Sequence, residues 1–129
     1  MLAWLLGEDA PPRVREVLSK AELVIASDLA LLESDRVLIR AVSLGEIEEA
    51  AAADRRAHLN AAATHWYVRR LSAEIVDRAG QGFPAGPIRT LDAIHPLAAR
   101  SGVSGVELLS LDDRVRRVGE QLGFRLQPE

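Results

Sequence analysis

The chain has 129 residues, of which 48% are hydrophobic and 27% charged, so it has the size and mix of a single globular domain covering residues 1–129. Cysteine is absent, which excludes a disulfide scaffold, a thiolate zinc site and a cysteine nucleophile. The formal charge of −3 creates no overall positive field, so any binding of nucleic acid must depend on a local group of basic residues.

The first half of the sequence alternates short apolar runs with helical patterns. Its apolar start, residues 1–6, is far shorter than the roughly 20 residues of a membrane span, and no signal peptide precedes it, so we expect a cytoplasmic protein without membrane contact. Pro11 and Pro12 open a helix, and Ser27 and Asp28 are suitable caps for the next one. The pattern predicts helices over residues 13–20, 28–44 and 46–66, a break at Gly45, and a strand over residues 23–26.

The second half continues the same alternation. Residues 80–87 are the part of the chain richest in glycine and proline, which predicts a loop. The pattern predicts helices over residues 72–79, 88–100 and 112–122, and strands over residues 68–71, 106–109 and 124–126. Ser101 and Gly102 are expected to end the second of these helices. Short apolar strands followed by helices indicate parallel strands joined by right-handed crossovers, so the expected fold class is α/β.

Several common catalytic motifs are missing from the sequence. No Gly-x-Gly-x-x-Gly follows a strand, and no lysine follows the glycine-rich loop as it does in a phosphate-binding loop. No serine lies in a Gly-x-Ser-x-Gly elbow, so a Ser-His-Asp hydrolase is not supported. A phosphoacceptor receiver domain needs a lysine late in the chain, and Lys20 is the only lysine present.

Glu33 is the first carboxylate in an unexpected position. Its neighbours at helical spacing form an apolar stripe that should face the core. A desolvated and unpaired carboxylate there costs several kcal/mol, so Glu33 needs a partner. That partner is either Arg36 or Arg40 in an ion pair, or a metal or proton-transfer site.

Asp92 lies near the start of the helix predicted over residues 88–100, where a negative charge is favourable. Because it shares a helix face with His95, we expect its side chain to be half-buried. Thr90 is the expected cap of this helix, and Pro96 is expected to kink it.

Asp112 follows directly after the strand predicted over residues 106–109. Ser110 and Asp113 have the spacing of a capping box, which gives Asp113 a structural role and leaves Asp112 without one. Ligands of α/β sheets bind beyond the carboxyl ends of the strands, and Glu33 and Asp112 both follow strand ends. We therefore expect these two acids to converge on one rim of the sheet.

Carboxylates gathered in one pocket repel one another unless a cation is present. Mg²⁺ or Mn²⁺ suits such a pocket because hard divalent ions prefer oxygen ligands, and such a site favours hydrolysis of a phosphodiester. The three histidines do not have the paired spacing of metal ligands; they are His58, His65 and His95.

The C-terminal motifs resemble those of PIN-domain ribonucleases, especially the VapC type of toxin–antitoxin systems. Residues 89–95, followed by 97–99, resemble the third acidic motif of this family, and residues 108–115 resemble the segment with its fourth acid, with Ser110 in place of the usual threonine. Residues 23–40 are similar to the second motif, and residues 124–126 to the closing strand.

This resemblance implies a three-layer α/β/α sandwich with a central parallel sheet, an acidic Mg²⁺ or Mn²⁺ pocket and endonucleolytic cleavage of RNA. It also implies a homodimer and neutralisation by a small antitoxin protein. By position, Glu33, Asp92 and Asp112 are the expected metal ligands and catalytic acids, with Ser110 and Asp113 as accessory residues. Four arginines are candidates for contacts with RNA phosphates, the alternative being solvated helix faces: Arg36, Arg40, Arg89 and Arg114.

The sequence departs from this family at its start. The family opens with a strand that ends in an aspartate, whereas residues 1–8 resemble the helix that should follow that strand, and Glu8 and Asp9 lie at the wrong end of it. We therefore expect either a truncated start or a natural variant with a weakened site. The alternative function is a catalytically impaired PIN-like domain that binds a partner protein, with an arginine of the partner docked in the acidic pocket.

Overall fold

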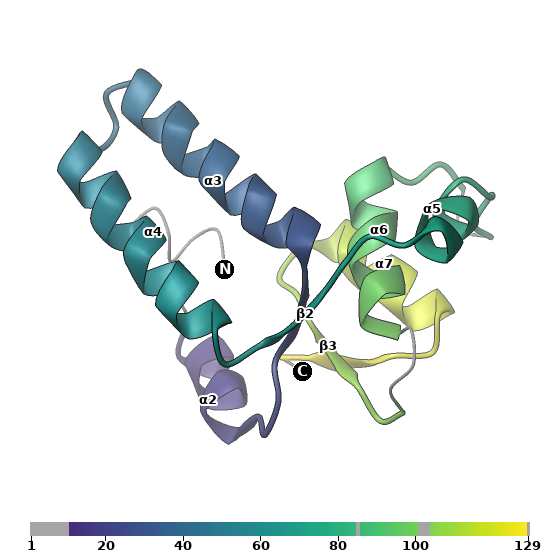
Figure 1. The fold of residues 1–129 in the computed structure, drawn as a ribbon. Coiled ribbons are helices and arrows are strands. Elements are labelled where there is room, and N and C mark those ends of the chain that lie inside the picture. Colours follow the sequence, from purple (N-terminus) through teal and green to yellow (C-terminus); the bar gives the residue numbers. More distant parts are fainter. Residues whose placement is uncertain (1–10, 85, 101–103, 129) are drawn as a thin grey trace.

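The computed structural model describes residues 11–84, 86–100 and 104–128 (Figure 1). The expectations for the apolar start, for Glu8 and Asp9, and for the helix end at residues 101–102 lie outside these ranges. The described helices are α2 (Pro12–Lys20), α3 (Asp28–Ser43), α4 (Glu49–Ala63), α5 (Ala73–Ala79), α6 (Thr90–Arg100) and α7 (Asp113–Gln121). The described strands are β1 (Ile25–Ser27), β2 (Tyr67–Arg69), β3 (Glu107–Leu109) and β4 (Arg125–Gln127).

The strands confirm the α/β class and the parallel pairing. β1 pairs with β2 and β3 pairs with β4, both in parallel, with Ala26 opposite Val68 and Leu108 opposite Leu126. Within the described ranges these are two separate two-stranded sheets, where one central sheet was expected, and the three-layer arrangement is not seen. Each strand is only three residues long, and β1 and β3 are each hydrogen-bonded to one neighbouring strand and not to each other.

Two apolar cores hold the helices in place. Leu38 from α3 packs with Ala52 and Leu59 from α4, and all three side chains are buried. The second core joins α5 and α6 through Ile75, Ile94, Leu97 and Ala98. In Figure 1 the α3–α4 hairpin and the group of α5, α6 and α7 lie on opposite sides of the strands. The second core therefore fixes α6, the helix that carries Asp92.

Local signals set the ends of α3 as predicted. Its N-terminus is capped by Ser27, whose Oγ accepts a hydrogen bond from the backbone N–H of Ala30. At its C-terminus, the N–H groups of Gly45 and Glu46 donate to the carbonyls of Val42 and Ala41. This is a Schellman motif, and it requires the positive φ of 70° that glycine adopts without strain.

One prediction about α6 is wrong in detail: Thr90 is the first residue of the helix and not the cap before it. The helix continues through the buried Pro96 to Arg100, the last residue of the predicted helix. Because proline has no N–H, the carbonyl of Asp92 receives no helical hydrogen bond from position 96. No helix in the described part of the chain is long and apolar enough to cross a membrane.

Candidate functional site

The three predicted acids come from three different parts of the chain, each next to a strand in the sequence or close to one. Glu33 lies on α3, Asp92 lies in the first turn of α6, and Asp112 comes directly before α7. α6 packs against β1, the strand that precedes α3, and against α7, the helix that follows Asp112.

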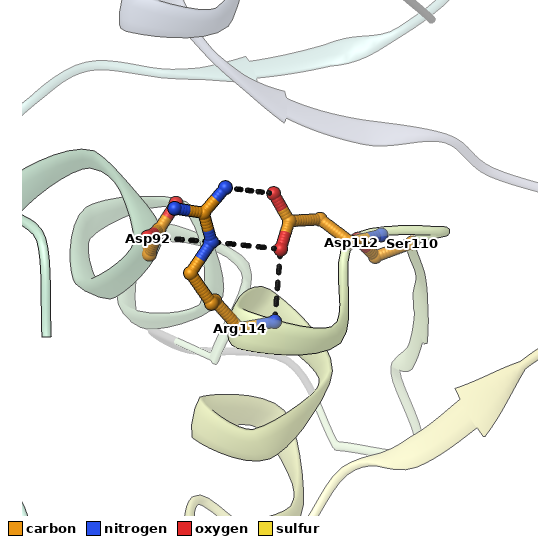
Figure 2. Close-up of polar contacts among 4 residues, drawn as sticks. All are labelled: Asp92, Ser110, Asp112 and Arg114. Carbon is orange, nitrogen blue, oxygen red and sulfur yellow. Dashed lines mark hydrogen bonds and ion pairs between the residues drawn. The ribbon is translucent and has the colours of Figure 1, made fainter.

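Asp92 and Asp112 meet on the guanidinium of Arg114 (Figure 2). The Nε atom of Arg114 lies 3.4 Å from Oδ1 of Asp112 and 3.9 Å from Oδ2 of Asp92. Its Nη2 atom lies 3.5 Å from the other carboxylate oxygen of Asp112. One positive charge therefore lies between two acids that are 20 positions apart in the sequence.

The Asp92 carboxylate is half-buried, as its helix position predicts. Its side chain is 15% exposed, and its buried Oδ2 atom accepts no hydrogen bond within the described ranges. A buried acceptor without a hydrogen bond is rare and unfavourable. The ion pair with Arg114 offsets part of the charge but does not satisfy this oxygen.

Asp112 caps a helix, a structural role that the sequence pattern predicted for Ser110 and Asp113. It is the N-cap of α7, and its Oδ1 atom accepts a hydrogen bond of 2.8 Å from the backbone N–H of Arg114. Ser110 does not cap the helix, because its Oγ accepts from the backbone N–H of Asp112. The predicted capping box of Ser110 and Asp113 is therefore wrong, and Asp113 is the exposed first residue of α7.

The backbone hydrogen bond from Arg114 lowers the pKa of the Asp112 carboxyl below its ordinary value of 3.8, and the Arg114 guanidinium lowers it further. Since the pKa is depressed in the folded protein, the ionised carboxylate stabilises the fold above pH 3.8, and this contribution is lost as the pH falls through the lowered pKa.

The substitution Asp112→Asn should remove this pH dependence, because asparagine retains a capping oxygen but cannot ionise. We expect the difference in free energy of unfolding between wild type and the variant to be constant above pH 3.8 and to shrink below it. Urea denaturation from about pH 2 to pH 6 measures this difference. A difference that does not change over this range would contradict the assignment.

Glu33 is paired with a histidine and not with Arg36 or Arg40. Its Oε2 atom lies 2.6 Å from Nε2 of His95, and the two side chains are 27% and 25% exposed. On the other side of the ring, Nδ1 lies 3.1 Å from Oγ of Ser27. Because Ser27 accepts from the N–H of Ala30, its hydroxyl hydrogen is free to donate to Nδ1. This assigns the remaining ring hydrogen to Nε2, which donates it to Glu33.

The structure thus brings two of the three predicted acids into contact with one cation, and the third contacts His95 instead. Glu33 contacts α6 three residues after Asp92, through His95. The described residues nevertheless contain no group of three acidic, histidine or cysteine side chains close enough to hold a metal ion. His95 was noted in the sequence only as a neighbour of Asp92 on a half-buried face, and its bond to Glu33 depends on the packing of α3 near α6.

The candidate phosphate contacts are spread over the surface. Arg36, Arg40 and Arg89 have exposed side chains. Arg114, which is 53% exposed, is the candidate that contacts the predicted acids.

Comparison with known proteins identifies the family of the chain. No curated protein matches it. The PIN domain family matches residues 1–121, a range that contains Glu33, Asp92 and Asp112. Proteins of this family are generally nucleases and typically use divalent metal ions. Because the match covers almost the whole sequence, the chain belongs to the PIN domain family.

Proposed function

We propose that the protein is a metal-dependent endoribonuclease of the VapC toxin type, which cleaves RNA phosphodiester bonds in the cytoplasm. The observation that carries this proposal is the meeting of Asp92 and Asp112 around one positive charge, with a buried oxygen of Asp92 that has no hydrogen bond. Membership of the PIN domain family supports a nuclease, and the resemblance of residues 89–99 and 108–115 supports the VapC type.

The acids fit a magnesium or manganese ion by their chemistry. Mg²⁺ is usually held by one or two carboxylates, with water and substrate phosphates as the other ligands, so two aspartates are sufficient. The buried Oδ2 of Asp92 is an acceptor that needs a partner. The lowered pKa of Asp112 means that its environment favours the ionised form that binds a cation. We propose Asp92 and Asp112 as ligands, with Glu33 as the third acid of the site.

A divalent ion in such a site activates water and stabilises the charge on the leaving oxygen. The protein's own side chains position the groups that react. Nε2 of His95 donates to Oε2 of Glu33, and Ser27 bonds the other side of the ring. These contacts fix the orientation of the Glu33 carboxylate, which can then receive a proton or direct a water molecule. The exposed arginines on α3 and before α6 are available to neutralise RNA phosphates.

Two partners belong to the same proposal. We infer that the protein forms a homodimer and that a small antitoxin protein neutralises it. Both follow from the resemblance to the VapC type. Among the described strands each sheet has only two, and an outer edge that is bonded to no other described strand is consistent with pairing to another chain.

The proposal is tested by incubating the purified protein with an end-labelled RNA and a DNA of the same sequence. We expect internal cleavage of the RNA with Mg²⁺ or Mn²⁺, no cleavage in EDTA, and none of the DNA. Cleavage that persists in EDTA would contradict the metal-dependent mechanism. No cleavage of several unrelated RNAs with either metal would favour the second candidate.

The second candidate is a catalytically impaired PIN-like domain that binds a partner protein. It is favoured by the arginine already placed between the two aspartates and by the lack of a three-residue metal cluster in the described ranges. Such a domain would bind the partner without metal and would not cleave RNA.

A further inference from the structure

We propose that Arg114 is an internal cation that occupies the place between Asp92 and Asp112 and has to be exchanged for the divalent ion. The inference rests on the proposed metal site and identifies the residue that sets its affinity. In this account Arg114 stabilises the metal-free protein and competes with the metal.

The contacts of Arg114 neutralise both acids but satisfy only one of them. Its guanidinium donates from Nε and Nη2 to Asp112 at 3.4 and 3.5 Å. It reaches Asp92 only as an ion pair at 3.9 Å, and Oδ2 of Asp92 has no hydrogen bond in the described ranges. A guanidinium is a planar fork suited to a single carboxylate, whereas a metal ion can bind oxygens from several directions. In the present arrangement, Oδ2 of Asp92 can therefore still bind a metal ion more closely than it binds Arg114.

The exposure of the three side chains allows this exchange. Arg114 is 53% exposed and Asp112 43%, whereas Asp92 is 15% exposed. The guanidinium therefore lies on the solvent side of the buried acid, and it can leave without opening the core. The cap of α7 does not depend on the guanidinium, because Asp112 accepts from the backbone N–H of Arg114.

The charges of these groups determine whether removal of the Arg114 guanidinium strengthens or weakens metal binding. A divalent ion bound by both aspartates would be repelled by a guanidinium that contacts the same aspartates, and two ionised aspartates repel each other when neither cation is present. Removing the guanidinium should consequently favour metal binding and disfavour the metal-free fold. Because Arg114 and Asp112 are partly exposed, both effects should weaken as salt is added.

The first measurement is calorimetric titration of Mn²⁺ into wild type and the variant Arg114→Gln. We expect the variant to bind Mn²⁺ about three- to tenfold more tightly at low ionic strength, with a smaller difference in about 0.5 M salt. The matched control is Arg117→Gln, which removes an exposed arginine from the same helix, and its Mn²⁺ affinity should stay close to that of wild type.

The second measurement is the melting temperature in EDTA of wild type, Arg114→Gln, Asp92→Asn and the double variant. If Arg114 is the counter-ion of Asp92, its substitution should lower the melting temperature by about 2 °C in the wild-type background and by less in the Asp92→Asn background. Equal shifts in both backgrounds would overturn this part of the proposal.

The two measurements separate failure of this inference from failure of the proposed function. Mn²⁺ binding of equal or lower affinity in Arg114→Gln, together with metal-dependent RNA cleavage, would overturn the exchange while the function stands. An absence of Mn²⁺ binding in wild type and in every variant would overturn the exchange and the proposed function together. Tighter binding in Arg114→Gln with a coupled loss of metal-free stability would support the exchange.

Discussion

Replacing Asp92 with asparagine is expected to abolish metal-dependent RNA cleavage and to leave the fold intact. Asparagine has nearly the same shape, but it carries no charge to hold a divalent ion. The carboxylate is only 15% exposed, and its Oδ2 atom has no hydrogen bond in the described part of the chain, so the substitution removes an ion pair with Arg114 but no hydrogen bond at this oxygen. Metal ions contribute several kcal/mol to such reactions, which corresponds to a loss of at least about a hundredfold in rate.

The control for this experiment is Asp35→Asn. Asp35 also pairs with an arginine, since its Oδ1 lies 2.8 Å from Nε of Arg56, but this pair joins the α3–α4 hairpin and contacts none of the proposed ligands. We expect Asp35→Asn to cleave RNA at the wild-type rate. Circular dichroism should show the same helix content in all three proteins. Unchanged cleavage by a folded Asp92→Asn variant would refute the assignment of Asp92.

Replacing Leu38 with alanine is expected to give the largest loss of stability. Its side chain is 0% exposed and packs between α3 and α4 against Ala52 and Leu59. Removing a buried leucine side chain loses its transfer energy and leaves a cavity, for a total of about 2–5 kcal/mol. Since domains of this size are stable by only about 5–15 kcal/mol, urea denaturation should detect the change readily.

The matched control lies six residues earlier on the same helix. Leu32 is 55% exposed, so Leu32→Ala should change the free energy of unfolding by less than about 0.5 kcal/mol. Equal losses from the two substitutions would show that α3 does not pack on α4 through Leu38. RNA cleavage by Leu38→Ala, measured well below its melting temperature, should be close to that of wild type because Leu38 is not part of the site.

The helices were the most predictable part of the fold, because their ends depend on nearby residues. Ser27 caps α3 as expected, and Gly45 ends it through a backbone conformation that the residue type favours. The predicted helix over residues 46–66 is shorter in the structure, since α4 runs from Glu49 to Ala63. High alanine content favours a helix but does not determine where it begins or ends.

The sequence named three candidate acids, but it did not predict which side chains they contact. Helical periodicity correctly predicted a half-buried Asp92, because burial of a helix face follows from sequence spacing. The sequence offered two kinds of partner for Glu33, an arginine on the same helix or a metal or proton-transfer site, and the side chain that it contacts is His95, 62 positions away. The cap of α7 was assigned to Ser110 and Asp113 because their spacing matches a motif, but the loop geometry gives that role to Asp112.

The amino-acid sequence alone determined the order of helices and strands and the parallel α/β class, because local spacing and propensity govern these properties. Only the tertiary structure decided that the four described strands form two separate pairs, that Arg114 lies between Asp92 and Asp112, and that His95 holds Glu33. These contacts join residues far apart in the chain. They depend on how α6 packs against β1 and α7, which no local pattern specifies.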